Sequence, residues 1–313
     1  VCRVKFSGTR ANAVVFSQGG KLKTAVARQE VILSAGALQS PQLLQLSGIG
    51  DATTLRNLGI DVLLDRPQVG QNLQDHLQIR VMHRCNEPLT TNDDLRSWSR
   101  KIGMAVQYVA KRAGPMAVGI NQAGAFVRTR ADLERPDIQF HFAALSSDLP
   151  GAPLHDFSGF TSSVCQLRPT SRGHLKMTSN DPFARPEIHP GYLSTEEDQK
   201  TVVAALQVTR RIAQQPALAR FIVEEYKPAG DTQTDAALLE FARNNGVTIF
   251  HPAGTCRMGI DDHAIVDPSL KVKGVAGLRV VDCSIMPTLV SGNTHAPAVM
   301  IAEKAADMIL DDV

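Results

Sequence analysis

The chain has 313 residues, enough to bury a substantial core and to form two domains. Its 33 basic residues nearly balance its 31 acidic residues, which leaves a formal net charge of +2. That balance, with no basic stripe along the chain, argues against a nucleic-acid-binding protein. A hydrophobic content of 43% and a charged content of 20% are typical of an ordinary globular protein.

The five cysteines are odd in number and widely scattered, and no two of them form a C-x-x-C pair. This usage predicts neither a metal site nor a disulfide framework, and it favours a reducing compartment such as the cytoplasm. No apolar run reaches the length of a membrane span, because Glu303 and Lys304 interrupt the most apolar C-terminal stretch. The sequence is compatible with a peripheral contact to a membrane.

The first residues, Val1-Cys2-Arg3-Val4, include no initiator methionine and no signal-peptide pattern. Their pattern is that of the interior of a strand, and the following segments, through Phe16 and Ala25, predict a β-meander. We therefore expect the chain to be a piece of a longer protein.

The next elements alternate between short apolar runs and helical patterns. Residues 30–36 form an apolar run ended by glycine, which predicts a buried strand. Ser40-Pro41 then predicts a helix N-cap followed by proline at the first helical position, with a leucine-rich face and a stop at Gly48. A short helix is expected to end at Gly59, and residues 60–64 resemble another buried strand.

Strand-like segments separated by loops dominate the middle of the chain and predict an antiparallel sheet. They cover residues 77–83, 138–145, 161–167, 174–178 and 185–189.

Four amphipathic patterns predict helices in the same region and beyond it. The first carries its apolar side chains on one face and ends at Gly114-Pro115; the second opens with a capping box at residues 194–197. A third runs from about Asp235 to Asn244 and closes at Gly246, and a terminal helix covers residues 299–310. The apolar positions are Leu95, Trp98, Ile102, Val106 and Val109 in the first helix, and Val202, Leu206 and Ile212 in the second.

Two glycine-rich segments carry the residues most suited to chemistry: residues 251–259 begin with His251, and residues 291–297 contain Asn293 and His295. Alcohol oxidation by hydride transfer needs one group to take the hydroxyl proton and a second to hold the oxygen. A neutral histidine suits the first task, and an amide or a second imidazole suits the other. Either segment by itself could be a turn whose histidine caps a loop. Together with a further motif upstream, they indicate a catalytic pair.

That further motif is the segment at residues 36–50, which closely resembles the second signature of the glucose–methanol–choline (GMC) oxidoreductases. Residues 69–76, 251–259 and 278–287 resemble three further blocks of the same family. The resemblance runs over essentially the whole chain, but it covers only the C-terminal part of a family subunit.

The resemblance implies a mixed α/β and α+β fold in two domains. Residues 1–76 would form part of a Rossmann-like FAD-binding domain, and residues 77–250 a substrate-binding domain built on an antiparallel sheet. Residues 251–313 would return to the FAD-binding domain with the catalytic residues. The N-terminal GxGxxG segment, which cradles the ADP phosphates in the family, is missing from this sequence.

The resemblance also implies a reaction, the FAD-dependent oxidation of a primary alcohol to an aldehyde. His251 would accept the hydroxyl proton while hydride passes to flavin N5. Counting back from the terminal helix without a gap, the second catalytic position falls on Asn293, which would hold the substrate oxygen. Within the family, the sequence most resembles choline dehydrogenase-like and aliphatic alcohol dehydrogenase members. The resemblance therefore implies an alcohol as substrate and an electron acceptor (a quinone, another carrier or O2) as partners.

By the same analogy, the cofactor contacts fall on Val1 through its backbone, Asn72, Asp282, Asn293, Thr294 and His295. Each has a plainer interpretation: Asp282 could cap the following turn, Asn293 could be a turn residue, and His295 could pack a loop. His76 beside Asp75 is interpreted as a structural hydrogen-bonded pair, and Cys256 and Cys283 as packing residues. The remaining histidines are interpreted as ordinary: His83, His141, His155, His174, His189 and His263.

Two rival functions remain open. The chain could belong to a hydroxynitrile-lyase-like protein that keeps FAD without using it for redox chemistry, or it could be a truncated remainder unable to bind FAD. Within the leading hypothesis, one Trp and three Tyr are few for the aromatic cage that a quaternary ammonium group favours, which weighs against choline as the substrate.

Overall fold

The computed structural model describes residues 1–149, 151–230 and 232–312, and the chain divides into two compact units. Unit 1 comprises Val1–His76, Arg168–Ser194 and Phe250–Val313, and unit 2 comprises Leu77–Leu167 and Thr195–Ile249. We expected a continuous domain over residues 77–250, but residues 168–194, in the middle of that range, belong to unit 1. Backbone hydrogen bonds explain the difference, because Gly173 exchanges two with Leu73 (2.8 and 2.9 Å) and Leu175 N donates to Gly70 O (2.8 Å).

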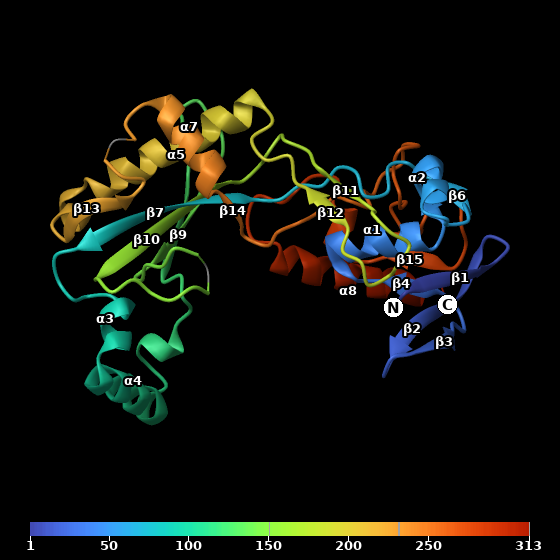
Figure 1. Cartoon of the computed structure of the whole chain (residues 1–313), viewed down its shortest axis with the longest axis horizontal. Coiled ribbons are helices and arrows are strands. Elements are labelled where there is room, and N and C mark those ends of the chain that lie inside the picture. Colours follow the sequence, from blue (N-terminus) through green and yellow to red (C-terminus); the bar gives the residue numbers. More distant parts are fainter. Residues whose placement is uncertain (150, 231, 313) are drawn as a thin grey trace. The chain divides into compact units, whose positions relative to one another are not determined.

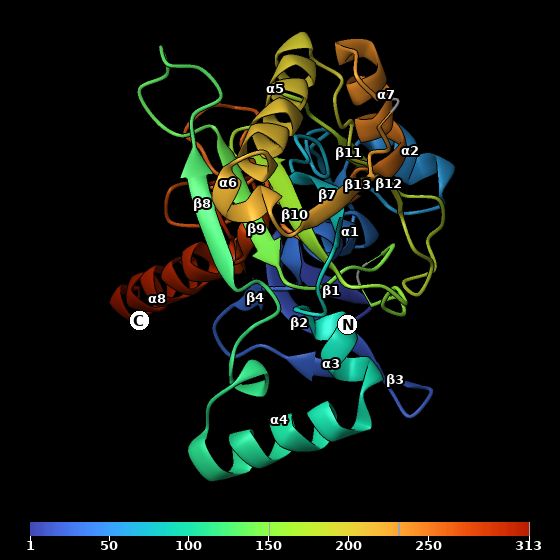
Figure 2. The ribbon, with the colours of Figure 1, turned by 90° about the vertical axis from the view of Figure 1, so that its left-hand side faces the viewer.

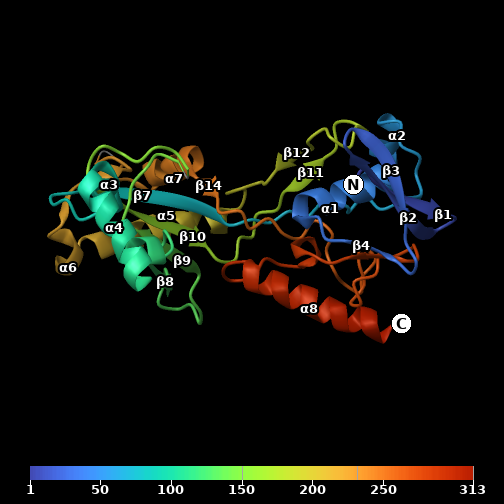
Figure 3. The ribbon, with the colours of Figure 1, turned by 90° about the horizontal axis from the view of Figure 1, so that it is seen from below.

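Unit 1 begins with the predicted β-meander, an antiparallel sheet in the order β1-β2-β3. Its second sheet pairs β4 with β15 in parallel, two strands separated by most of the chain, and helix α1 follows β4 directly. Figure 3 shows α8 as one continuous helix of this unit. The strands are β1 (Arg3–Ser7), β2 (Arg10–Gln18), β3 (Lys21–Val26), β4 (Val31–Leu33), β5 (Ile49–Gly50), β6 (Leu64–Asp65), β11 (His174–Lys176), β12 (Glu187–His189) and β15 (Leu278–Val280). The helices are α1 (Gly36–Leu46), α2 (Ala52–Asn57), the 3-10 turn η2 (Cys283–Ile285) and α8 (His295–Asp311).

Helix α1 starts earlier than predicted, so the assignment of Ser40 as its N-cap is wrong. Gly36, at φ 83°, turns the chain straight from β4 into the helix, and Pro41 lies inside it. A proline there leaves the carbonyl of Ala37 without its usual N–H partner. The hydroxyl of Thr255 donates to that carbonyl at 2.6 Å, which satisfies it and fastens α1 to the segment that follows His251.

Two further predictions for unit 1 are corrected. Residues 60–63 are not a strand, because the N–H groups of Leu63 and Leu64 both turn toward Gly48 O and only β6 reaches the ladder with β5. The segments around His174 and His189 pair only with each other, as β11 and β12. They do not join the large antiparallel sheet, because they belong to the stretch that is hydrogen-bonded to residues 70–73 of unit 1.

The core of unit 1 joins α1, β4, β15 and α8 through fully buried aliphatic side chains such as Leu44, Leu278 and Val280. One charged group is buried with them. Arg279 on β15 is 1% exposed, donates to both carboxylate oxygens of Glu30 (3.0 and 3.1 Å) and also pairs with Asp312. This network ties β15 to the residue before β4 and to the residue after α8. The buried guanidinium is not left with an uncompensated charge, because two carboxylates pair with it.

Unit 2 contains the antiparallel sheet, in the order β13-β7-β10-β9-β8, with β14 also pairing with β7. Helix α5 packs on β10 and β7, and α7 packs on α5, so both helices lie on one side of the sheet (Figure 1). The strands are β7 (Leu77–Cys85), β8 (Ala123–Val127), β9 (Ile138–Ala143), β10 (Gly159–Gln166), β13 (Ile222–Lys227) and β14 (Val247–Thr248). The helices are α3 (Thr91–Arg96), α4 (Trp98–Lys111), the 3-10 turn η1 (Pro115–Ala117), α5 (Glu196–Ala213), α6 (Pro216–Ala219) and α7 (Asp235–Asn245).

The first predicted helix of unit 2 is divided at Ser97, which ends α3 and caps the start of α4, so Leu95 lies on a different helix from Trp98. The other helices of unit 2 follow their predicted signals with two exceptions in α5. Its N-cap is Thr195 rather than Ser194, because the Thr195 hydroxyl accepts from Asp198 N at 3.3 Å. Val202 and Leu206 are buried as predicted, but Ile212 is 40% exposed near the end of the helix. None of the helices among the described residues is long and apolar enough to cross a membrane.

Candidate active site around His251

His251 lies at a sharp bend where the chain re-enters unit 1. The preceding residue, Phe250, has a φ of 63°, a left-handed conformation that a bulky side chain adopts only at a cost of about 1–3 kcal/mol. The bend leaves His251 only 7% exposed, and its backbone N–H donates to Oδ1 of Asp75 at 2.9 Å. The hydroxyl of Tyr192 donates to the other oxygen of the same carboxylate. Asp75 therefore fixes the backbone at His251 and is itself fixed by Tyr192.

The imidazole of His251 is held by a second histidine. Its Nδ1 lies 2.9 Å from Nδ1 of His76, and the two rings meet edge to face, with centroids 5.2 Å apart and planes at 83°. His76 is fully buried. Two ring nitrogens at this distance share one hydrogen, so one ring donates from Nδ1 and the other accepts. From the sequence, His76 is expected to be a structural residue beside Asp75, and its contact with His251 is not predicted because 175 residues separate the two histidines.

The segment after His251 is fitted closely against residues 72–74. Gly254 has a φ of 91°, and a Cβ at this position would lie 2.6 Å from the carbonyl oxygen of Asn72. The side chain of Asn72 donates to Gly254 O at 3.1 Å, and Ala253 and Gln74 exchange two backbone hydrogen bonds (2.9 and 3.0 Å). Gln74 also accepts from Leu289 N at 3.0 Å. Residues 72–76 therefore join the His251 segment to the chain that follows η2.

Asp282 lies at the carboxyl end of β15 and connects it to the start of α1. Its Oδ2 accepts from Gly36 N (2.9 Å) and from the hydroxyl of Ser40 (2.5 Å), and its Oδ1 accepts from Ser284 N (2.8 Å). The side chain thus caps the following turn, which is the plainer of its two interpretations. The nearby thiols of Cys256 and Cys283 both have a pKa raised by burial, so they are poor nucleophiles, as expected of packing residues.

The carboxyl ends of β4 and β15 form an edge of the kind that binds nucleotides. In open α/β folds, ligands bind beyond the carboxyl ends of parallel strands, often at the N-terminus of the next helix. Here that edge is made by Gly36 and Asp282, and α1 begins at Gly36. A Cβ added to Gly36 would meet no atom within 4 Å, so the backbone there is open to a ligand. The Gly36 N–H is already bonded to the Asp282 carboxylate, so this edge leaves room for a cofactor but does not offer that N–H to a phosphate.

The segment of the second catalytic candidate is held differently. Asn293 and His295 are exposed, and Thr294 is the N-cap of α8 without a side-chain cap bond. Just before them, the hydroxyl of Ser291 accepts from Arg168 at 3.2 Å. The predicted site residues therefore fall into a buried group (His251 with residues 72–76), a capped turn at Asp282 and an exposed helix start. Val1, which precedes β1, is 64% exposed.

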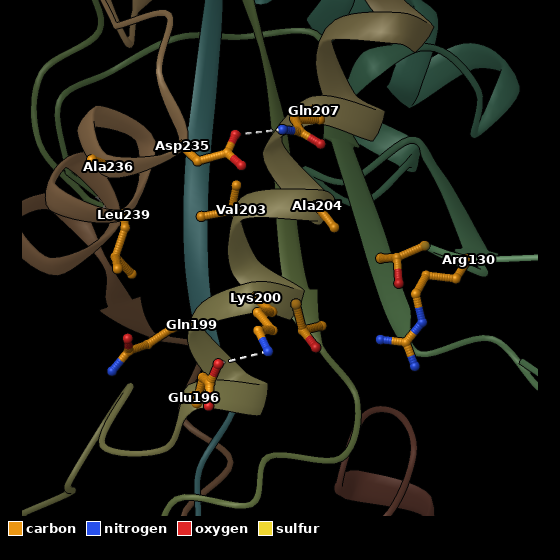
Figure 4. A pocket seen from close by; sticks show the side chains of 12 residues that line it. Arg130, Glu196, Gln199, Lys200, Val203, Ala204, Gln207, Asp235, Ala236 and Leu239 are labelled. Atoms are coloured by element: carbon orange, nitrogen blue, oxygen red, sulfur yellow. Dashed lines mark hydrogen bonds and ion pairs between the residues drawn. The ribbon is translucent and has the colours of Figure 1, made fainter.

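A cavity of about 510 Å³ in unit 2, lined mainly by α5 and α7, contains none of these residues (Figure 4). Its charged groups are paired with their neighbours: Lys200 with Glu196 at 2.6 Å, and Asp235 with the Gln207 amide at 2.7 Å. Lys200 and Glu196 neutralise each other and Asp235 already accepts a hydrogen bond, so these groups are weak anchors for a charged substrate. This cavity is therefore not the candidate site.

Comparison with known proteins agrees with the arrangement in unit 1. Two family models, both described as GMC oxidoreductase, match residues 1–78 and 169–302. An oxygen-dependent choline dehydrogenase from Burkholderia pseudomallei is 44% identical over 308 residues, which are 98% of this chain and 54% of that protein. The chain thus spans about half the length of the curated relatives it matches.

Solved structures agree as well. Pyridoxine 4-oxidase from Mesorbium loti is 31% identical with a TM-score of 0.84, over 98% of this chain and 56% of that one. A formate oxidase of Aspergillus oryzae, studied for the modification of its FAD, is 26% identical with a TM-score of 0.92, over 99% of this chain and 59% of that one. From its site, its sequence relatives and its fold, the chain belongs to the GMC oxidoreductase family.

Proposed function

We propose that this protein catalyses the FAD-dependent oxidation of a primary alcohol to an aldehyde, with His251 as the proton acceptor. One observation carries the proposal: His251 is buried and held at two points. Asp75 binds its backbone N–H, and His76 binds its imidazole ring. A general base must be held in position and in a defined protonation state before the substrate arrives. The family relatives support flavin-dependent alcohol oxidation in general terms.

The cofactor contacts of the proposal lie on the open edge at Gly36 and on the residues named from the family resemblance. Val1, Asn72, Asp282, Asn293, Thr294 and His295 would hold FAD, with Asp282 contributing through the turn that it caps. FAD, when bound, supplies the hydride acceptor at N5 of its ring. The protein contributes binding, orientation and the management of the proton.

The protonation states of the two histidines follow from the shared hydrogen. For His251 to accept a proton from substrate at Nε2, its Nδ1 must carry the hydrogen and donate to Nδ1 of His76. His76 then carries its own hydrogen on Nε2. When His251 takes the substrate proton it becomes positive, and its bond to His76 becomes a stronger, charge-assisted one. His76 is thus a positioning residue that stabilises the protonated form of His251.

Asn293 has the complementary role in the proposal. Its amide N–H donates to the substrate oxygen and stabilises the negative charge that develops there as the proton leaves. His295 would lie beside it, near the flavin. Replacement of Asn293 by Ala is expected to slow flavin reduction by about 10- to 100-fold, the value of one hydrogen bond to a charged group.

The proposed substrate is a primary alcohol. The positions of the aromatic residues help to decide between choline and an uncharged alcohol. An aromatic cage for a quaternary ammonium group needs several rings around one point. In the described residues, Trp98 and Tyr108 lie on α4, Tyr226 contacts Phe157 and His155, and Tyr192 is hydrogen-bonded to Asp75. Trp98 and Tyr108 stand ten residues apart on one helix and do not surround a common point, so the proposal favours an uncharged alcohol over choline. The electron acceptor is a quinone, another carrier or O2.

The proposed place of action is the cytoplasm, with a membrane contact considered below. The five cysteines form no disulfide among the described residues, a usage that favours a reducing compartment.

Anaerobic mixing of the full-length protein with alcohols tests the proposal. Bound flavin should bleach with a primary aliphatic alcohol, and more slowly with choline at equal concentration. Flavin that binds but is not reduced by any alcohol contradicts the oxidation. Release of cyanide from a cyanohydrin without bleaching would establish the lyase instead. For the 313-residue chain alone, a yellow purified protein refutes the interpretation of a remainder unable to bind FAD, and a colourless one supports it.

A further inference from the structure

Helix α4 of unit 2 exposes an apolar stripe that has no counterpart to pack against in its own unit. No residue of this helix, all of which the structure describes, is buried. Trp98 is 76% exposed, Ile102 and Val106 are each 60% exposed, and Val109 is 74% exposed. Figures 1 and 2 both show α4 set apart from the strands of unit 2. An amphipathic stripe normally faces a core, so this one needs another apolar environment.

The helix is nevertheless well formed by local interactions. The Ser97 hydroxyl accepts from Arg100 N at 3.4 Å at its start, and Arg112, at φ 49°, ends it with a bond from its N–H to Tyr108 O. At 100° per residue, the four exposed apolar side chains fall within an arc of about 80°. Lys101, Met104 and Tyr108 form its less exposed side. The stripe therefore faces away from the rest of unit 2.

The charges of this segment are all of one sign. Residues 97–112 contain four cationic side chains and no acidic one. The Lys101 ammonium lies 5.1 Å from the centre of the Trp98 ring, at the border of the stripe, and Arg112 is on the same side of the helix. Beyond the helix, Met116, Val118 and Ile120 are also more than half exposed. Lys101 and Arg112 therefore border one side of the apolar stripe, whereas Lys111 and Arg100, which is paired with Asp94, lie on the opposite face.

We propose that α4 lies in the headgroup layer of a membrane that contains anionic lipids. The stripe would face the acyl chains, and Lys101, Arg112 and their neighbours would meet the phosphates. A large amphipathic moment, low overall hydrophobicity, basic residues and a tryptophan are the features of interfacial helices. Pairing of two copies through α4 is disfavoured, because a two-fold contact sets cations against cations. The inference is independent of the reaction proposed for His251.

The chain contains a single tryptophan, Trp98, which lies on the stripe and reports on its environment. In the full 313-residue chain, its emission should be that of an exposed indole and should shift to the blue with vesicles of phosphatidylcholine and phosphatidylserine. Brominated acyl chains should then quench it. Emission that is already blue and protected from acrylamide without lipid would mean that another segment, or a second copy, covers the stripe, and overturns the proposal. So does emission unchanged by vesicles.

Paired variants separate the two parts of the surface. Ile102→Gln with Val106→Gln keeps helix propensity but should weaken vesicle binding at least about 100-fold, because two buried aliphatic side chains are lost. Lys101→Gln with Arg112→Gln should weaken it at least about 10-fold and reduce its salt dependence. The matched control is Val223→Gln with Ile260→Gln, two apolar residues that are 60% and 88% exposed elsewhere. Equal loss in that control, or no loss in either α4 pair, contradicts the assignment to α4.

Discussion

His251 and His83 are both buried, at 7% and 2% exposure, yet their surroundings are opposite. His251 in unit 1 shares a hydrogen with His76, and its backbone is held by Asp75. His83 in unit 2 stacks on Phe160, and its Nδ1 has no hydrogen-bond partner among the described residues. Burial and the positive charge of Arg210 lower the pKa of His83 to about 4.

The contrast shows that burial by itself does not identify a catalytic histidine. A proton acceptor must be able to carry a positive charge for part of the reaction, so it needs a neighbour that stabilises the charged ring. In the proposed tautomers His76 offers His251 an acceptor nitrogen, whereas Arg210 opposes a positive charge on His83.

The largest expected difference is in catalysis. His251→Ala should slow the reduction of bound flavin by alcohol by about 10²–10⁴-fold, the usual loss of a general base. His83→Ala removes an equally buried imidazole and should leave the rate per bound flavin within about threefold. Stopped-flow reduction of the two variants, normalised to flavin content, measures both. Equal losses would remove His251 from the proposed role.

The next difference is in acid stability. His83 has a pKa of about 4 in the folded chain and an ordinary value of 6.5, so between these pH values the unfolded chain binds the extra proton. Its contribution is fully present above about pH 6.5 and is lost as the pH falls toward 4, by roughly 3 kcal/mol in all. Urea unfolding at a series of pH values measures it. His83→Phe should flatten the curve in this range, and an unchanged slope would contradict the assignment.

A smaller effect is expected from the partner of His251. His76→Ala should slow flavin reduction by about 10- to 100-fold, because the bond that strengthens as His251 becomes charged is lost. Without that acceptor the ring is harder to protonate, so the acid side of the pH–rate profile should move to lower pH. His76→Asn, whose amide oxygen can accept from Nδ1, should restore much of both. A rate loss without any change of the pH profile would indicate a packing role only.

The smallest effect is expected at Tyr192, which contacts Asp75 and not His251 itself. Tyr192→Phe removes the hydroxyl that donates to Asp75 and should lower the free energy of unfolding by about 2 kcal/mol, as for a hydrogen bond to a charged group. Tyr226→Phe loses the same atom in unit 2 and should change it by less than about 0.5 kcal/mol. Thermal unfolding of both variants tests the difference. Equal shifts would mean that Asp75 does not depend on Tyr192.

Local signals predicted most of the elements. The β-meander, the helix over Asp235–Asn245 and strands β7, β9 and β10 follow from period-two patterns, caps and glycines, whereas β8, β13 and β14 were not predicted. The errors arose where distant residues changed a local preference. Ser40-Pro41 reads as a helix start, but Thr255 satisfies the carbonyl that Pro41 leaves unpaired, and the helix begins earlier. The apolar stripe of α4 predicts a helix correctly but does not say whether it faces a core.

By itself, the sequence predicted that His251 and residues 291–297 carry the chemistry and showed a resemblance to GMC oxidoreductases, because those signals are contiguous motifs. Only the tertiary structure decided how His251 is held. Its contacts with Asp75, His76 and, through Asp75, Tyr192 join residues far apart in the chain, and no local pattern encodes a hydrogen bond across 175 positions. Folding brings these groups together because a buried polar side chain must find a partner. The structure also decided that the stripe of α4 is exposed, since packing, not periodicity, determines burial.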